Sequence, residues 1–129
     1  KIFHNMKNSF IKNLNLWKLN KKKYIKNLNK LYGPLLAKSY PARACVIINY
    51  LGLNNSNIKN IYEKNISKKI NKYVPGTNIK IISDNHFDKK NFTTPIINFS
   101  WHISREIRKY LKQNGIKNRV FDIVEKRDY

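Results

Sequence analysis

The sequence contains a single cysteine and no long apolar run. Cys45 has no second thiol to pair with, so an internal disulfide is excluded, as in most proteins of the reducing cytoplasm. The longest apolar candidate, residues 45–53, is interrupted by Asn49 and Tyr50 and is shorter than the roughly 18 residues of a membrane-spanning helix. We therefore expect a cytoplasmic protein with no membrane partner.

Sequence patterns that mark catalytic and metal centres are also missing. The three histidines and Cys45 match no zinc-binding spacing. Neither a phosphate-binding Walker loop nor a nucleophile elbow is present. No catalytic residue and no metal ligand is therefore predicted.

Acidic side chains are scarce, with 7 Asp and Glu against 27 Lys and Arg and a net charge of +20. A codon bias toward A and T explains why lysine outnumbers arginine, but it does not explain so few acids. A charge of this size attracts polyanions. We infer that an anionic ligand or an acidic partner domain accounts for part of it.

Residues 1–29 are expected to form an N-terminal amphipathic helical connector. Its apolar side chains recur at helical spacing, at Phe3, Met6, Phe10, Leu14 and Trp17. This stripe is expected to pack on the rest of the chain or on a preceding domain. The lysines at 21–23 are expected to break it, with a second short helix at 24–28. Because the chain begins at Lys1, we expect it to be part of a longer protein.

From residue 30 to residue 129 the sequence alternates between strand and helix patterns, which predicts one further domain. Strands are expected at 30–32, 58–62, 78–82, 95–99 and 120–123, and helices at 41–51 and 103–114. Ser100 is the expected N-cap of the second helix. Such alternation predicts an α/β fold with a mostly parallel sheet of about five strands flanked by helices.

Three short loops, at 39–44, 72–77 and 100–102, each look like a segment that follows a strand. In a parallel sheet such loops meet at the carboxyl edge, where open α/β sheets bind their ligands. We therefore expect all three loops to border one binding crevice.

Candidate substrate-binding residues in or beside these loops are Tyr40, Arg43, Lys69, Tyr73, Thr77, Trp101 and His102. Arg43 can pair bidentately with phosphate or carboxylate, and Tyr40 can stack on a sugar or base. A type II turn at 75–76 would place Thr77 at the start of a strand. His102, in a first helical turn, favours the neutral imidazole. Each residue also has a structural interpretation, as a packing or loop-bracing side chain.

Four motifs carry a family resemblance: Ser-Tyr-Pro-Ala-Arg-Ala at 39–44, Ile-Asn-Tyr-Leu-Gly-Leu at 48–53, Lys-Ile-Asn-Lys-Tyr-Val-Pro-Gly-Thr at 69–77, and Ser-Trp-His-Ile at 100–103. In order and spacing they resemble the C-terminal domain of S-adenosylmethionine-dependent C-methyltransferases, over about residues 30–125. The resemblance implies a Rossmann-like domain that helps hold a nucleotide-linked sugar or a similar anionic metabolite.

The same resemblance implies that S-adenosylmethionine is bound by an upstream domain not present in this chain. The sequence has no Gly-x-Gly-x-x-Gly, no Cys-x-x-Cys pair and no Glu-His dipeptide. We therefore expect a substrate-side part of a transferase, catalytically incomplete alone. The loop between Tyr32-Gly33-Pro34 and residues 40–43 is longer than in many members of the family. A longer loop changes the wall of the crevice, so the substrates of the sugar-modifying members are not assigned to this chain.

Two other functions are compatible with the sequence. A basic nucleic-acid-binding module would use the charge and the aromatic side chains for phosphate contacts and base stacking. However, the basic residues are spread along the whole chain without a recognised binding motif, so we do not expect nucleic acid as the partner. An interaction domain without a ligand would instead dock a partner through the amphipathic helix at 3–17.

Overall fold

The structure is a computed structural model that describes residues 2–128. Its α-helices and strands follow the chain as α1 (Ile2–Tyr32), β1 (Leu35–Lys38), α2 (Ala42–Tyr50), β2 (Ile58–Glu63), β3 (Lys80–Ser83), β4 (Ile96–Asn98), α3 (Ser104–Gln113) and β5 (Val120–Asp122). Short 3-10 turns lie at η1 (Asp84–His86), η2 (Trp101–Ile103) and η3 (Lys126–Asp128). No helix between residues 2 and 128 is both long and apolar enough to cross a bilayer.

The five strands form one sheet in the order β3-β2-β1-β4-β5, and every neighbouring pair is parallel. The predicted α/β fold with a parallel sheet is therefore confirmed. The chain runs outward from β1 to β3 and then returns to place β4 and β5 on the other side of β1. This reversal creates a topological switch point between β1 and β4, where α/β sheets of this order bind ligands.

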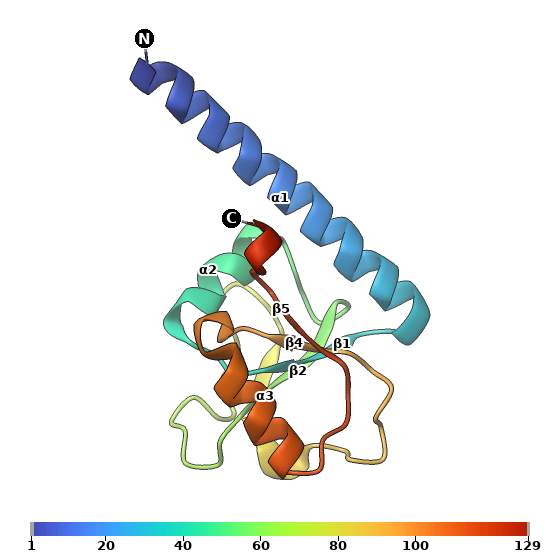
Figure 1. The fold of residues 1–129 in the computed structure, drawn as a ribbon. Coiled ribbons are helices and arrows are strands. Elements are labelled where there is room, and N and C mark those ends of the chain that lie inside the picture. Colours follow the sequence, from blue (N-terminus) through green and yellow to red (C-terminus); the bar gives the residue numbers. More distant parts are fainter. Residues whose placement is uncertain (1, 129) are drawn as a thin grey trace.

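Alternate residues of β1 point to opposite faces of the sheet and build two apolar cores. Leu35 and Ala37 are fully buried on the face that α1 and α2 cover. Leu36 packs on the other face against Ile107 and Leu111 of α3. Figure 1 shows α1 and α2 on one side of the sheet and α3 on the other. The two layers of helices fix the strands and thus the loops that leave them.

The helix α1 is continuous, so the predicted break at 21–23 is wrong. Lysine is a good helix former, and Lys21 is buried, with its Nζ 3.3 Å from Glu125 and 3.4 Å from Asp128. The predicted strand at 30–32 is also wrong, because α1 continues to Tyr32. Gly33 follows with a φ of +74°, the left-handed conformation that commonly ends a helix.

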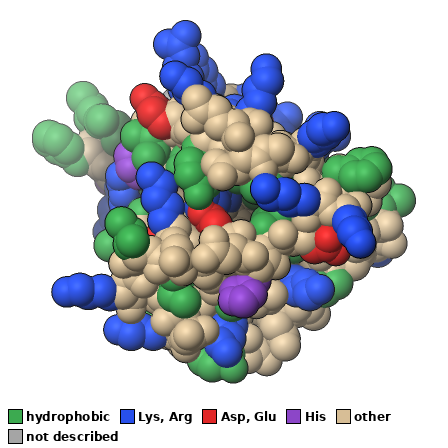
Figure 2. Space-filling view, turned by 90° about the horizontal axis from the view of Figure 1, so that it is seen from below, with side chains coloured by type: hydrophobic (Ala, Val, Ile, Leu, Met, Phe, Trp, Pro, Cys, Tyr) green, Lys and Arg blue, Asp and Glu red, His purple; other side chains and the backbone are tan. Residues whose placement is uncertain are grey.

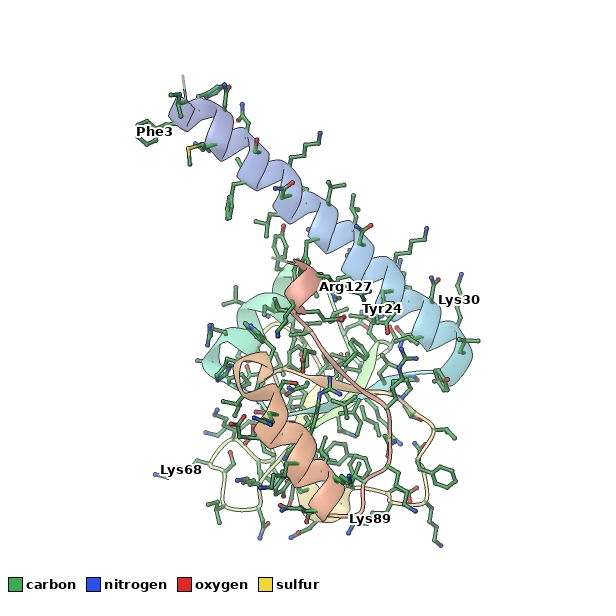
Figure 3. All side chains as sticks on the ribbon, in the orientation of Figure 1. Phe3, Tyr24, Lys30, Lys68, Lys89 and Arg127 are labelled. Carbon is green, nitrogen blue, oxygen red and sulfur yellow. The ribbon has the colours of Figure 1, made fainter. Side chains whose placement is uncertain are left out.

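Only the second half of α1 packs on the sheet. Ile25 is fully buried, and Trp17 stacks on Tyr50 of α2 with ring centres 6.4 Å apart. Figure 1 shows the first half extending beyond the rest of the molecule, and Figure 3 shows Phe3 at its far end. Phe3 is 86% exposed and Phe10 is 66% exposed. The predicted apolar side chains do share one helix, but the first turns of α1 contact no part of the sheet.

The other elements lie close to their predicted positions, with one correction at Ser100. The helix α3 begins at Ser104, after the 3-10 turn η2, and not directly after Ser100. The Ser100 side chain caps neither helix. Its hydroxyl group instead forms a hydrogen bond with that of Ser39, a residue 61 positions away that no local pattern indicates.

Candidate functional site

The loop between β1 and α2 is fixed by hydrogen bonds to the end of β2. The Ser39 amide donates to the carbonyl of Tyr62 at 2.9 Å, and the Tyr40 amide donates to the carboxylate of Glu63. Ser39 has a φ of +74°, an uncommon conformation for a residue with a side chain. These contacts turn the chain at the carboxyl edge and place Arg43 in the first turn of α2.

The segment after β4 is fixed by a buried polar network that no local sequence motif predicts. Asn98 is fully buried, accepts a hydrogen bond from the Ser100 amide at 2.9 Å, and donates one to Asp122 at 2.9 Å. Ser104 also donates to Asp122 at 2.9 Å. An Asn at a strand end and an Asp at the next strand end are the only signals in the sequence. This network holds η2 against the ends of β4 and β5.

A hydrogen bond between the hydroxyl groups of Ser39 and Ser100 joins these two loops. Ser39 follows β1 directly, and Ser100 lies two residues after β4. The contact therefore lies at the switch point of the sheet. It brings residues 39–44 and 100–102 together at the edge that was predicted to bind a ligand.

Four predicted site residues form two pairs in and beside these loops. The Cζ of Arg43 lies 5.1 Å from the ring centre of Trp101. The Nζ of Lys69 donates to the Tyr40 carbonyl at 2.5 Å and lies 5.7 Å from the Tyr40 ring centre. Arg43 and Lys69 are exposed, whereas the two aromatic rings are half-buried. The result is a pair of accessible cations supported by two aromatic side chains.

The protonation of Tyr40 is set by its surroundings. Burial raises the pKa of Tyr40 to about 12, and the neighbouring Cys45 thiol adds to the rise. The phenol is therefore neutral at physiological pH. It can donate one hydrogen bond to a ligand while its ring packs in the loop.

His102 lies in η2, beside Trp101. The two rings are edge to face with centres 6.0 Å apart, and His102 is exposed. It thus precedes α3 and does not lie in the first turn of that helix, contrary to what its position in the sequence predicted. Its imidazole lies next to the Arg43–Trp101 pair and is accessible to a ligand.

The loop at 72–77 lies at the opposite edge, and this part of the prediction is wrong. Tyr73 pairs antiparallel with Lys80, the first residue of β3. The carbonyl of Pro75 accepts a hydrogen bond at 2.9 Å from Asn49, in the last turn of α2. The chain leaves β2 at the carboxyl edge and then runs back along β3. Tyr73 and Thr77 are therefore at the amino edge, away from Arg43.

The turn at 75–76 itself is as predicted. Gly76 has a φ of +80°, and the Thr77 amide donates to the Val74 carbonyl at 3.0 Å, as in a type II turn. Thr77 Oγ1 also donates to this carbonyl at 2.9 Å. The positive φ favours glycine here, and a Cβ at this position would lie 2.5 Å from Asn49 Oδ1, so the Asn49 side chain would have to move. The Thr77 side chain is thereby engaged in the turn.

The comparison with known protein families decides what kind of domain this is. A family model described as C-methyltransferase C-terminal domain matches residues 5–121. The chain belongs to this family. The match begins within α1 and so extends further toward the N-terminus than the resemblance inferred from residues 30–125. No curated protein matches the chain.

The C-methyltransferase C-terminal domain seen here lacks a glycine-rich loop at its carboxyl edge. Gly33 and Gly52 follow α1 and α2, Gly76 precedes β3, and Gly115 follows α3. The β1–α2 loop instead contains Ser39, Tyr40 and Pro41.

A second polar cluster, which no local sequence pattern indicates, lies on the α3 face of the domain. Lys38, at the end of β1, is 3% exposed, and its Nζ lies 2.7 Å from Asp84 Oδ2. The Tyr110 hydroxyl donates to the same carboxylate oxygen at 2.7 Å. Burial, followed by this hydrogen bond, raises the pKa of Tyr110 to about 12. The cluster links β1, η1 and α3, and its groups are engaged with each other.

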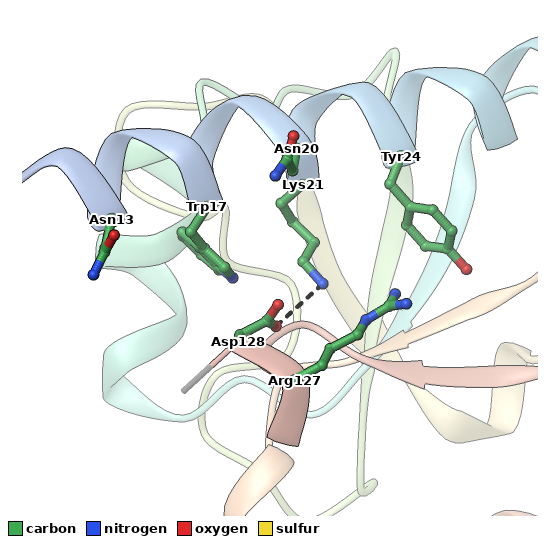
Figure 4. Close-up of a pocket in the computed structure, with 7 residues that line it drawn as sticks. All are labelled: Asn13, Trp17, Asn20, Lys21, Tyr24, Arg127 and Asp128. Atoms are coloured by element: carbon green, nitrogen blue, oxygen red, sulfur yellow. Dashed lines mark ion pairs between the residues drawn. The ribbon is translucent and has the colours of Figure 1, made fainter.

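A cavity of about 460 Å³ lies between α1 and the C-terminal turn η3. In Figure 4, Trp17, Lys21 and Tyr24 extend from α1 toward Arg127 and Asp128 of η3. None of the predicted site residues lines it. Within residues 2–128, no three metal-binding side chains lie close enough together to hold a metal ion.

Positive charge is spread over the face of the molecule that Figure 2 shows. Figure 2 shows Lys and Arg side chains on all sides of the face seen from below, with apolar and uncharged groups between them.

Proposed function

We propose that this C-methyltransferase C-terminal domain binds the anionic substrate of a carbon methylation, of the nucleotide-linked sugar class. The observation that carries the proposal is the exposed guanidinium of Arg43 over Trp101, at the switch point of the sheet. A cation supported by an aromatic ring suits a ligand that has both an anionic and a ring-shaped part.

Each residue of the group has a defined part in this proposal. Arg43 pairs bidentately with a phosphate or carboxylate. Trp101 and Tyr40 offer ring faces to a sugar or base, and the neutral Tyr40 phenol donates a hydrogen bond. Lys69 adds a second positive charge, and His102 donates or accepts a hydrogen bond at the rim. Tyr73 and Thr77 do not belong to this group, because they lie at the amino edge.

The methyl donor in this proposal is S-adenosylmethionine, and an upstream domain binds it. The absence of a glycine-rich loop at the carboxyl edge supports this division. The residues of the present domain bind and orient the substrate, and such positioning can itself lower a reaction barrier considerably. A cytoplasmic location is part of the proposal, since Cys45 has no partner for a disulfide.

Isothermal titration calorimetry with UDP, TDP and GDP, and with the matching nucleosides as uncharged controls, tests the proposal. At about 150 mM salt, where non-specific charge effects are screened, at least one diphosphate should bind and its nucleoside should bind more weakly. Arg43→Ala should weaken binding about tenfold, the usual cost of losing a charged hydrogen bond. Lys112→Ala, in the last turn of α3, removes one charge from the other end of the domain and is the matched control.

Equal affinities for the Arg43→Ala and Lys112→Ala variants would reject Arg43 as a ligand-binding residue. No diphosphate binding by the unaltered domain would reject the substrate class.

A further inference from the structure

The arginines of this lysine-rich chain are concentrated around one groove. Only 5 of the 27 basic side chains are arginines. Four of them line a single groove of about 920 Å³: Arg105, Arg108, Arg119 and Arg127. The fifth, Arg43, lies over Trp101, which lines the same groove. Lysines are scattered over the surface, so this placement is not a simple consequence of the net charge.

The groove opens from the candidate site and follows the free edge of the sheet. Strand β5 is the last strand of the sheet and pairs only with β4 among residues 2–128. Arg119 precedes β5, and Arg127 lies after it in η3. Arg105 and Arg108 come from α3. Trp101 and His102 form the end of the groove that adjoins Arg43.

Two of the arginines are already engaged by neighbouring groups. Arg108 donates to the Ser104 hydroxyl and to the Val120 carbonyl, each at 3.0 Å, and lies 3.8 Å from Asp122. Arg127 lies 3.1 Å from Glu125. These two pairs neutralise two of the three acidic side chains in the groove.

The remaining charges favour an anion. The ion pairs within residues 2–128 do not engage Arg105, Arg119 or Lys126, all of which are exposed. Glu106 is the third acidic residue of the groove, so three free cations face one free carboxylate. Aromatic rings of Tyr24, Trp101 and Phe121 line the groove between them.

The chemistry of arginine narrows the ligand class. A guanidinium group presents paired N–H donors in a plane, which match two oxygens of one phosphate, whereas a lysine ammonium acts as a point charge. We propose that this groove binds the phosphate-bearing part of the substrate, with Arg105 and Arg119 as the principal ligands. This inference rests on the proposed function. It places the diphosphate along the β5 groove, with Arg43 pairing one phosphate at the Trp101 end, and leaves the ring-bearing remainder to the faces of Trp101 and Tyr40.

Binding of inorganic pyrophosphate and of UDP to an Arg105→Ala/Arg119→Ala double variant tests this assignment. Calorimetry at about 150 mM salt should show at least about tenfold weaker binding of both probes. The control is Lys109→Ala/Lys112→Ala, which removes two exposed charges from α3 outside the groove. The affinity of this control for both probes should stay within about twofold of that of the unaltered protein, because screened surface charges contribute little to binding. Circular dichroism confirms that all variants are folded.

A second variant separates bidentate recognition from charge. Arg105→Lys/Arg119→Lys retains both charges but not the fork of donors, so it should restore less than the full affinity for pyrophosphate. Affinity equal to that of the unaltered protein would show that the groove acts as a charged surface only, and would overturn the proposed bidentate site.

The outcomes also separate this inference from the proposed function. If Arg43→Ala weakens UDP binding and the double variant does not, the groove assignment fails and the proposed function stands. If the double variant binds pyrophosphate more weakly while Arg43→Ala leaves UDP binding unchanged, the groove assignment stands and the proposed site at Arg43 fails. Binding of an oligothymidine of about 12 nucleotides is measured as a third probe. Binding of the oligomer without binding of pyrophosphate or UDP would overturn the assignment, because the phosphate would then come from nucleic acid.

Discussion

The guanidinium of Arg43 lies over the indole of Trp101, 5.1 Å from its ring centre. Arg43 comes from the first turn of α2 and Trp101 from η2, which follows β4. The pair therefore bridges the two loops on either side of the switch point. Together with the Ser39–Ser100 hydrogen bond, it defines the shape of the candidate site.

This pair should contribute measurably to stability even without a ligand. A double-mutant cycle with Arg43→Ala and Trp101→Ala should give a coupling energy of about 0.5 to 1 kcal/mol, as expected for a cation over an aromatic ring at a partly exposed site. Urea unfolding of the four proteins provides the measurement. Strictly additive effects would show that the two side chains do not interact in solution.

The buried Lys38–Asp84 pair should be sensitive to loss of one partner. Lys38→Ala leaves the Asp84 carboxylate without its ammonium partner and should cost about 3 kcal/mol or more of unfolding free energy. Lys38→Met combined with Asp84→Asn should cost less, because no unpaired charge remains. Lys64 is an exposed neighbour of Tyr110, and Lys64→Ala is the control. Its unfolding free energy should stay within about 0.5 kcal/mol of that of the unaltered protein. A Lys38→Ala effect as small as the control would contradict the buried ion pair.

Alkaline pH should remove the contribution of Tyr110 to stability. Its pKa is raised from 10.0 to about 12, so the folded state holds the proton more tightly than the unfolded state. The contribution is complete below pH 10 and is lost as the pH rises toward 12. Tyr110→Phe should therefore be less stable than the unaltered protein below pH 10, and the gap should narrow across this window. A gap that stays constant in urea unfolding at both ends of the window would refute the assignment.

The two halves of α1 should respond differently to truncation. Ile25→Ala removes a fully buried side chain and should cost about 2 to 5 kcal/mol. Met6→Ala, on a side chain that is 63% exposed, should change stability by less than about 0.5 kcal/mol. Thermal unfolding of the two variants decides between this arrangement and one in which the whole helix packs on the sheet. Similar losses for both variants would support the latter.

The parts of the fold that local patterns determine could be predicted from the sequence. Strands β2 to β5 and the two later helices carry dense apolar repeats between turn residues, and their positions are confirmed within a few residues. Strand β1 could not be located, because its Leu-Leu-Ala-Lys sequence has no β-branched residue and includes a charge. Its last residue, Lys38, is buried only because Asp84 lies opposite, and that partner is 46 positions away.

Long-range contacts also explain the remaining differences. The lysines at 21–23 do not interrupt α1, because Glu125 and Asp128 from the other end of the chain pair with Lys21. Ser100 is not a helix cap, because its hydroxyl group contacts Ser39. The loop at 72–77 is at the amino edge, because Asn49 binds the Pro75 carbonyl. Each of these partners is set by the tertiary fold, which spacing along the sequence does not reveal.

Chemical-shift mapping of the ¹⁵N-labelled protein during titration with UDP tests the central claim most directly. Binding at the switch point predicts that the perturbed amides lie at 39–44 and 100–105, while those at 72–77 stay unchanged. Perturbations confined to 72–77, or to the exposed first half of α1, would contradict the placement of the substrate site at the carboxyl edge.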